Sequence, residues 1–296
     1  MKNQSLYIIS VIFLILISCK KKHTYLPIKH STLSQKFEVK GNQDTTIQTQ
    51  NGTILRLSAG CFIDSGVIKI QVEEYTKFSD ILLKGLNTKT DSGILETAGM
   101  FHISAFNEQN ESLQLDTSKP IKVYNPTIDS SYTIFHRSKE DSTDWENRAG
   151  KIVMIQPLGW TIKMMDNHMW KMYRERSMLV FELGWINFDK LLPCEKTNLI
   201  VYSEGQTETM KLKLKGYNTV INEFIIPKEG DISKFQFSEI PKDVEGVLIC
   251  FGINPNGKYY YNFIDISTSQ KEIHFPLMKE VESKKELIDL LEEKCG

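Results

Sequence analysis

The sequence lacks an excess of charge of either sign. Its 296 residues include 36 lysines and arginines against 37 aspartates and glutamates. Domains that bind nucleic acid through its phosphates usually present a concentrated basic surface. The balanced charge therefore argues against a nucleic-acid-binding protein.

Motifs that mark catalytic or cofactor sites are also missing. The chain contains no Gly-x-Ser-x-Gly elbow, no His-Glu-x-x-His, no phosphate-binding loop and no dinucleotide-binding glycine pattern. Carboxylates are frequent between residues 73 and 96, but no spacing brings two of them together for acid–base catalysis. We therefore expect a protein that is not an enzyme and that holds no cofactor.

Cysteine is scarce and is not arranged in pairs. Besides Cys19, the chain has four widely spaced cysteines and no Cys-x-x-Cys sequence, and the four are Cys61, Cys194, Cys250 and Cys295. This excludes a small scaffold built on disulfides, and the sequence leaves three pairings open. Cys250 lies within the apolar run of residues 247–251, which is typical of a small buried side chain.

Apolar runs long enough to cross a membrane are absent. The longest, Leu6 to Ile17, has 12 residues; as a helix it would rise about 18 Å, against roughly 30 Å of hydrocarbon. Lys2 precedes the run and three lysines follow Cys19, so a retained span would tend to leave the protein in the cytoplasm. The layout instead predicts a secretory signal peptide over residues 1–18.

The end of this signal is more specific. Leu16-Ile17-Ser18-Cys19 resembles the lipobox of bacterial lipoproteins. The resemblance implies cleavage before Cys19, diacylglycerol on its sulfur and a fatty acid such as palmitate on the new amino group. Two or more acyl chains anchor a protein stably, so residues 19–36 would form a lipidated tether.

The resemblance also bears on localisation. Some relatives among the Bacteroidota carry acidic residues just after the lipid-bearing cysteine, which direct them to the cell surface. This chain has Lys20, Lys21 and Lys22 there. We therefore expect a cell-envelope protein anchored to the outer membrane, with a position facing the periplasm preferred and the surface left open.

Short strands are predicted from residue 37 onward. Ile68, Ile70 and Val72 alternate with polar residues, which is the period of a strand with one buried face. Asn51-Gly52 separates two short apolar runs and predicts a hairpin. Residues 37–126 are therefore expected to form a β-sandwich.

Residues 51–62 and 66–70 resemble the opening of the ZU-five type β domain of ankyrins and netrin receptors. Residues 94–100 and 184–189 resemble two strings that recur in Bacteroidota envelope lipoproteins, although Phe188 stands where cysteine is usual. The resemblance implies a β-sandwich used for binding or scaffolding. Some relatives cleave themselves at His-Phe-Ser, but the closest strings here are His274-Phe275-Pro276 and His102-Ile103-Ser104, so self-cleavage is not expected.

The second half of the chain is predicted to contain another β-sandwich. Residues 127–192 are rich in aromatic residues and methionine and are expected to connect the two sandwiches. Residues 193–296 show further strand patterns, with a turn at Asn256-Gly257. Ser283-Lys284-Lys285-Glu286 is a capping-box pattern that predicts a C-terminal helix. The expected fold class is mainly β, with two β-sandwich-like domains and a short C-terminal helix after the signal peptide.

Two groups of side chains are candidates for binding sites. Trp160, Trp170 and Trp185 could form an aromatic platform for a glycan or peptide, or pack in the buried junction between sheets. If residues 165–172 are helical, one face would carry the Cu(I)-type ligands Met165, His168, Met169 and Met172. The alternative for the second group is a methionine-rich packing stripe.

The sequence as a whole favours a membrane-anchored, non-catalytic binding or scaffolding module of the cell envelope. Its expected partners are the membrane, through lipid on Cys19, and other envelope proteins or glycans. A glycan- or peptide-binding receptor subunit is the main alternative. An envelope hydrolase or self-processing protein is a further one.

Overall fold

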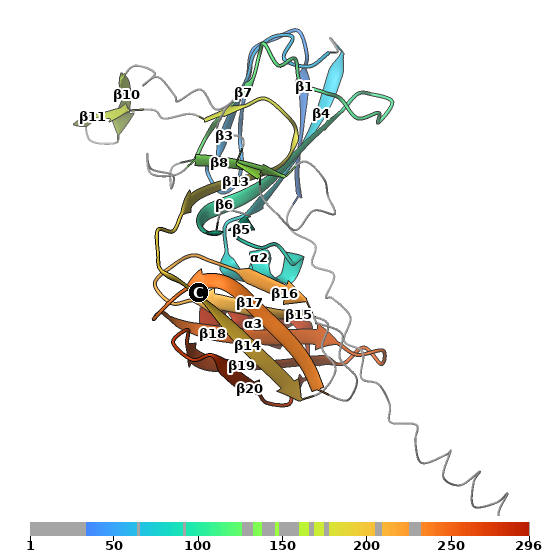
Figure 1. Cartoon of the computed structure of the whole chain (residues 1–296). Helices are drawn as coiled ribbons and strands as arrows, with labels where there is room; N and C mark the ends of the chain where they lie inside the picture. The colour runs from blue at the N-terminus through green and yellow to red at the C-terminus, as the bar shows by residue number, and fades with distance from the viewer. Residues whose placement is uncertain are drawn as a thin grey trace, which may run out of the picture.

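The computed structural model describes ten stretches of the chain, which are residues 34–63, 66–90, 93–125, 133–137, 146–147, 160–165, 169–174, 178–204, 209–224 and 232–295. Their fold is mainly β, with two β-sandwich-like halves and a short C-terminal helix, so the predicted fold class is confirmed. Figure 1 shows the two halves one above the other. The predicted signal peptide and Cys19 lie outside the described residues.

The first sandwich consists of two sheets. The strands of the larger sheet, in spatial order, are β1 (Ser34–Lys40), β4 (Val67–Tyr75), β6 (Gly93–Phe106), β13 (Gly184–Leu191), β8 (Thr133–Arg137) and β9 (Glu146–Asn147), with β5 (Lys89–Thr90) paired to β6. The strands of the smaller sheet, in spatial order, are β12 (Met178–Val180), β7 (Ile121–Tyr124), β3 (Ile54–Leu57) and β2 (Thr45–Gln48). All of these pairings are antiparallel.

The core of the first sandwich follows the predicted alternation. Ile68, Ile70 and Val72 are at most 1% exposed and face the smaller sheet, whereas the residues between them lie half-buried on the outer face. Phe101 and Phe188 meet edge to face in the same core, with ring centroids 5.0 Å apart. Phe188 therefore fills the first core, where the resembling string would place a cysteine.

Residues 127–192 do more than connect the two sandwiches. β12 pairs with β7, and β13 pairs with β6 from Gly184 to Leu191, so both strands complete the first sandwich. A division at residues 126 and 193 therefore does not match the sheets. The local pattern of β13 did not reveal its partner, because β6 lies about 80 residues earlier in the chain. β10 (Trp160–Met165) and β11 (Met169–Arg174) form a separate two-stranded sheet.

The second sandwich also has two sheets. The three-stranded sheet has the order β17 (Ile232–Pro241), β14 (Lys196–Glu204) and β20 (Glu272–Phe275), and β14 and β20 are parallel. The strands of the five-stranded sheet are β16 (Ile221–Phe224), β15 (Thr209–Leu214), β18 (Glu245–Ile253), β19 (Tyr259–Ser267) and β21 (Lys279–Val281). Buried residues such as Leu199, Leu212 and Phe235 form the core between these sheets.

The C-terminal helix α3 (Lys284–Cys295) begins at the predicted capping box. The backbone N–H of Glu286 donates to Ser283 Oγ at 3.1 Å, and the Glu286 carboxylate accepts from the N–H of Glu282 at 2.9 Å. Leu287 and Leu291 are fully buried against the sheet. No helix within the described ranges is long and apolar enough to cross a membrane.

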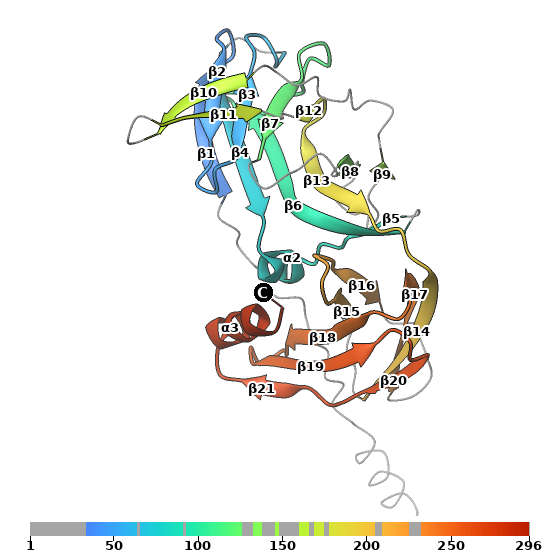
Figure 2. The same ribbon diagram turned by 90° about the vertical axis from the view of Figure 1, so that its left-hand side faces the viewer.

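A short helix, α2 (Phe78–Lys84), lies between the two sandwiches and was not predicted. Figure 2 shows α2 beside α3 at the waist of the molecule. Both helices contribute to a third cluster of buried side chains, which we call the junction core. It contains Tyr75, Phe78, Ile81, Leu82, Leu95, Met100 and Trp185 from the first half, and Val220, Val247, Ile249, Leu287 and Leu291 from the second. The two sandwiches therefore share buried apolar surface.

Candidate functional site

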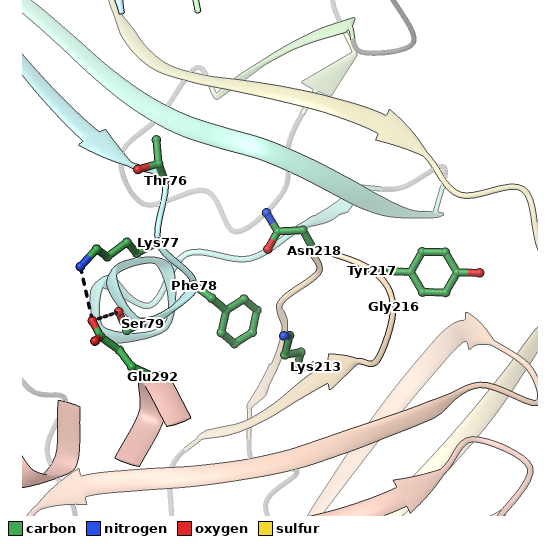
Figure 3. Close-up of a pocket in the computed structure, with 9 residues that line it drawn as sticks. All are labelled: Thr76, Lys77, Phe78, Ser79, Lys213, Gly216, Tyr217, Asn218 and Glu292. Carbon is green, nitrogen blue, oxygen red and sulfur yellow. Dashed lines mark hydrogen bonds and ion pairs between the residues drawn. The ribbon is translucent and has the colours of Figure 1, made fainter. Parts of the chain in front are cut away.

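A pocket of about 630 Å³ opens beside the junction core. Figure 3 shows its lining, which comes from three segments that are far apart in the chain. The lining residues come from the segment that leads into α2 and its first turn (Thr76, Lys77, Phe78 and Ser79), from the end of β15 and the turn after it (Lys213, Gly216, Tyr217 and Asn218), and from α3 (Glu292). Since the first sandwich leads into α2 and the second supplies the rest, we call this site the junction pocket.

One wall of the junction pocket joins the two helices. Glu292 on α3 lies 3.7 Å from Lys77 Nζ, and it accepts a hydrogen bond of 3.2 Å from the Ser79 hydroxyl. The side chains of Lys77 and Glu292 are 71% and 45% exposed, so this ion pair contributes little to stability. Its main effect is to place the carboxylate of Glu292, which is already paired with Lys77, at the wall of the pocket.

The opposite wall comes from the second sandwich. Lys213 Nζ lies 4.6 Å from the centre of the Phe78 ring, which is within the range of a cation–π contact. The side-chain amide of Asn218 donates to the backbone carbonyl of Thr97 at 2.6 Å. The backbone carbonyl of Asn218 accepts from the N–H of Thr97 at 2.9 Å. Because the amide nitrogen is bound to the first sandwich, the orientation of the Asn218 side chain is fixed.

The size and the polar lining of the junction pocket suit a small ligand. Its volume is in the range of ligand pockets, roughly 300–1,000 Å³. The lining residues include two lysines and one carboxylate, and neither histidine nor cysteine. The arrangement can therefore hold a polar ligand between charged and hydrogen-bonding groups.

Trp185 belongs to the junction core, and it is only 7% exposed. Its ring lies 5.4 Å from the Tyr75 ring and 5.0 Å from the His102 ring, and Lys84 Nζ lies 5.7 Å from its centre. This is the packing alternative that the sequence left open. The backbones of Trp160 and Trp170 lie in the β10–β11 hairpin, opposite Arg174 and Met164, and their side chains lie outside the described set.

Three of the four candidate Cu(I) ligands, Met165, Met169 and Met172, lie on strands rather than on a helix. β10 and β11 are strands, with Met165 opposite Met169 and Met172 opposite Ile162. His168 lies outside the described residues. The helix on which that arrangement depended is therefore not formed at the three methionines, because spacings of three and four also fit a hairpin. No group of three or more histidine, cysteine, aspartate or glutamate side chains in the described residues could hold a metal ion.

Among the described residues, Cys61, Cys194 and Cys250 form no disulfide. Cys250 is buried, as its apolar surroundings predicted. Burial also raises the pKa of the Cys61 thiol, which makes it a poor nucleophile. The side chain of Cys295 lies outside the described residues.

The two strings that resemble lipoprotein sequences lie side by side in the structure. Residues 94–100 are in β6 and residues 184–189 are in β13, and the two strands pair. The Thr97 hydroxyl donates to Asn187 Oδ1 at 2.7 Å, and the Asn187 amide donates to Asp189 Oδ2. All three side chains are at most 1% exposed. The strings therefore build one buried hydrogen-bonded group rather than an accessible site.

Asp189 is the one member of this group that is incompletely satisfied. Its Oδ1 atom is buried and has no hydrogen-bond partner among the described residues. Burial raises the pKa of this carboxyl well above its ordinary value. We therefore expect Asp189 to resist ionisation in the folded protein.

This pKa shift predicts that Asp189→Asn stabilises the protein at neutral pH. As pH rises above 3.8, the carboxyl in the unfolded chain loses its proton while the folded one keeps it, so stability falls. Asparagine cannot ionise, and we expect it to raise the free energy of unfolding at pH 7 by about 1–3 kcal/mol. The gain should shrink towards pH 3.

Urea denaturation at pH 7 and pH 3 measures this difference. Asp265→Asn is the matched control, because the Asp265 side chain is exposed and paired with Lys215. It should change the free energy of unfolding by less than about 0.5 kcal/mol. A less stable Asp189→Asn variant at pH 7 would contradict the prediction.

The sequence contained a signal for α2, but not for the junction pocket. Phe78, Ile81 and Leu82 have helical spacing, and Gly85 follows with φ +74°, which is a common helix ending. The pocket itself depends on residues more than 130 positions apart, which no local pattern relates.

Comparison of the chain with protein-family models, curated proteins and solved structures finds no match.

Proposed function

We propose that this chain is a lipid-anchored, non-catalytic binding module of the bacterial cell envelope, and that the junction pocket is its binding site. The observation that carries the proposal is the pocket of about 630 Å³ built jointly by both sandwiches. Its walls are held by hydrogen bonds from Ser79 to Glu292 and from Asn218 to Thr97. A preformed site of this kind loses little entropy when a ligand binds.

The anchoring part of the proposal rests on the lipobox resemblance at Cys19. The 14 residues from 20 to 33 separate Cys19 from the first strand, and fully extended they could span about 46–50 Å. Ser34 pairs with Glu73, close to the end of β4 that leads into α2. The tether thus joins the molecule near the junction pocket, and a pocket within tens of ångströms of a membrane suits a ligand or partner of the envelope.

The alternatives differ in what occupies the pocket. A glycan- or peptide-binding receptor subunit would use the same site and is the nearest alternative. An envelope hydrolase has less support, because the single carboxylate of the lining, Glu292, is already engaged by Lys77 and Ser79. We propose that the protein is anchored to the outer membrane and faces the periplasm.

The binding role is tested by photo-crosslinking in intact cells. A benzophenone amino acid replaces Tyr217, whose side chain lies at the pocket and is 38% exposed. The matched control replaces Leu277, which is 61% exposed and does not line the pocket. We expect adducts from position 217 in several-fold excess over position 277. Equal yields at the two positions, or none at position 217, would contradict the proposed site.

A further inference from the structure

The buried group on β6 and β13 brings a hydroxyl, an amide and a carboxyl together. Thr97, Asn187 and Asp189 are each at most 1% exposed, and the Thr97 hydroxyl lies 2.7 Å from Asn187 Oδ1. Because a C=O bond is about 1.2 Å long, the Thr97 oxygen lies within about 3.9 Å of the amide carbon Cγ. Nucleophiles react from about 3–3.5 Å, so a small rotation of either side chain brings these two atoms to reacting distance.

The backbone around Thr97 holds its hydroxyl in place. The register of β6 against β13 shifts at Asp189, which lies opposite Thr97, and leaves Ala98 as an extra residue in β6. Bulges of this kind redirect side chains and are frequent beside reactive sites. The backbone N–H and carbonyl of Thr97 are both bonded to Asn218. The Gly99 N–H donates to Thr97 Oγ1 at 3.0 Å, where it would stabilise negative charge on this oxygen as its proton leaves.

Asp189 is placed to move protons between the other two side chains. It lies directly opposite Thr97, and its Oδ2 atom accepts from the Asn187 amide nitrogen. The Cβ atoms of such cross-strand partners are about 4.5–5.5 Å apart, so the carboxyl and the hydroxyl are within reach of each other. Oδ1 is buried and has no hydrogen-bond partner among the described residues. Burial favours the protonated carboxyl, which can give a proton to the amide nitrogen and take one from the hydroxyl.

A second buried pair shows the ordinary arrangement of these residue types. The Asn125 amide nitrogen donates to Thr53 Oγ1 at 3.1 Å. The hydroxyl of Thr53 therefore faces an amide nitrogen, whereas the hydroxyl of Thr97 faces a carbonyl group. The arrangement at Thr97 is the one from which the oxygen can attack the amide carbon.

We infer that Thr97 and Asn187 join in an ester inside the folded chain, with Asp189 as the acid–base catalyst. Thr97 Oγ1 attacks Asn187 Cγ, so the Oγ1–Cγ bond forms and the Cγ–Nδ2 bond breaks. The amide nitrogen leaves as ammonia with the proton of the hydroxyl, which Asp189 relays, and Asp189 ends as it began. No group is oxidised or reduced, and no other reactant is needed. Since the group is buried, water that would hydrolyse the ester is excluded.

The ester would be a covalent bond between strands whose linked residues lie 90 positions apart in the chain. Figure 2 shows these strands, β6 and β13, next to each other in the first sandwich. A cross-link that closes a long loop restricts the unfolded chain more than one that closes a short loop. The reaction happens once in each chain, so it is compatible with a non-catalytic binding module and independent of what the junction pocket binds.

Peptide mass spectrometry of the full wild-type protein tests the ester. Trypsin, which cuts after lysine and arginine but not before proline, places Thr97 in residues 90–122 and Asn187 in residues 177–190. We expect one branched peptide that is lighter than the sum of these two by one ammonia. Hydroxylamine, which cleaves esters faster than amides, should separate the branched peptide into its two parts.

Variants identify the groups that react. Thr97→Val keeps the shape of the side chain without the hydroxyl and should give only the two separate peptides, whereas Thr97→Ser should retain the link. Asp189→Asn should slow formation of the branched peptide after a pulse of labelled amino acids by about 100-fold or more. Thr53→Val is the matched control, because it removes the hydroxyl of the other buried pair, and it should leave the link unchanged.

Three results would overturn the inference. The first is a wild-type protein that gives the two peptides separately at their sequence masses. The second is loss of ammonia from residues 177–190 alone that persists in Thr97→Val, since this indicates a succinimide at Asn187. The third is an unchanged rate of linking in Asp189→Asn, which would remove the role assigned to Asp189. The proposed binding function is tested separately, by crosslinking at position 217.

The ester also sets the background for the stability test of Asp189→Asn. A linked wild-type chain would gain stability from the bond itself. The comparison is therefore made between Thr97→Val and the double variant that also carries Asp189→Asn, because neither chain can be linked.

Discussion

Leu212→Ala is expected to lower the unfolding midpoint reported by tryptophan fluorescence, although Leu212 lies in the second sandwich and all four tryptophans precede that sandwich in the chain. Leu212 is fully buried in the core of the second sandwich. Truncating a buried leucine to alanine typically costs about 2–5 kcal/mol. Fluorescence should report this loss only if both sandwiches unfold together.

The junction core is the physical reason for this coupling. Leu82 of α2 and Trp185 of β13 belong to the same buried cluster as Val247 of β18 and Leu287 of α3. Unfolding one sandwich would expose the apolar surface that the other contributes to this cluster, at about 25 cal/mol per Å². We therefore expect the sandwiches to lose their structure in a single transition.

Urea titrations followed by fluorescence and by far-ultraviolet circular dichroism check the coupling. Both probes should give one midpoint, shifted equally by Leu212→Ala. Leu277→Ala is the control, because Leu277 is 61% exposed, and it should shift the free energy of unfolding by less than about 0.5 kcal/mol. Two separate transitions, with the fluorescence midpoint unchanged by Leu212→Ala, would show that the sandwiches fold independently.

Cys19→Ala is expected to abolish incorporation of a fatty-acid analogue into the protein. The lipobox resemblance places a thioether-linked diacylglycerol on Cys19, and alanine has no sulfur to carry it. Each buried methylene contributes about 0.8 kcal/mol to membrane binding, so loss of the acyl chains should also release the protein from the detergent-rich phase after phase separation. Metabolic labelling followed by gel fluorography measures the first effect.

Cys194→Ala is the matched control for this experiment. Cys194 is the exposed thiol among the described cysteines, so it is the residue most open to adventitious acylation. The Cys194→Ala variant should incorporate the label as the wild type does. Persistent labelling of Cys19→Ala would contradict the lipoprotein interpretation.

Local features of the fold were predictable because the responsible interactions are close in sequence. Asn51-Gly52 lies in the connection between β2 and β3, where Gly52 has φ +85°, and Gly257 has φ +80° in the turn between β18 and β19. Both hairpin turns need the positive φ that glycine adopts without strain. The capping box at Ser283 depends on contacts within four residues and was predicted for the same reason.

Features that depend on distant residues were not predictable from the sequence. β13 pairs with β6 across about 80 residues, and its partner cannot be read from its own pattern. The junction pocket combines Phe78, Lys213 and Glu292, which only the tertiary fold brings together. A spacing of four residues does not by itself identify a helix. Met165 and Met169 have this spacing, and they lie opposite each other in a pair of antiparallel strands rather than on one helix face. Trp185 is buried because aromatic side chains serve cores as readily as binding sites.

The central claim is that the binding module is anchored to a membrane by lipid. Mass spectrometry of the N-terminal peptide tests this claim most directly, with the mature wild-type protein purified from detergent-solubilised envelopes. The predicted peptide begins at Cys19 and carries diacylglycerol on its sulfur together with a fatty acid on its amino group. A mature chain that begins at Met1, or that contains an unmodified Cys19, would contradict the proposal of a lipid-anchored protein.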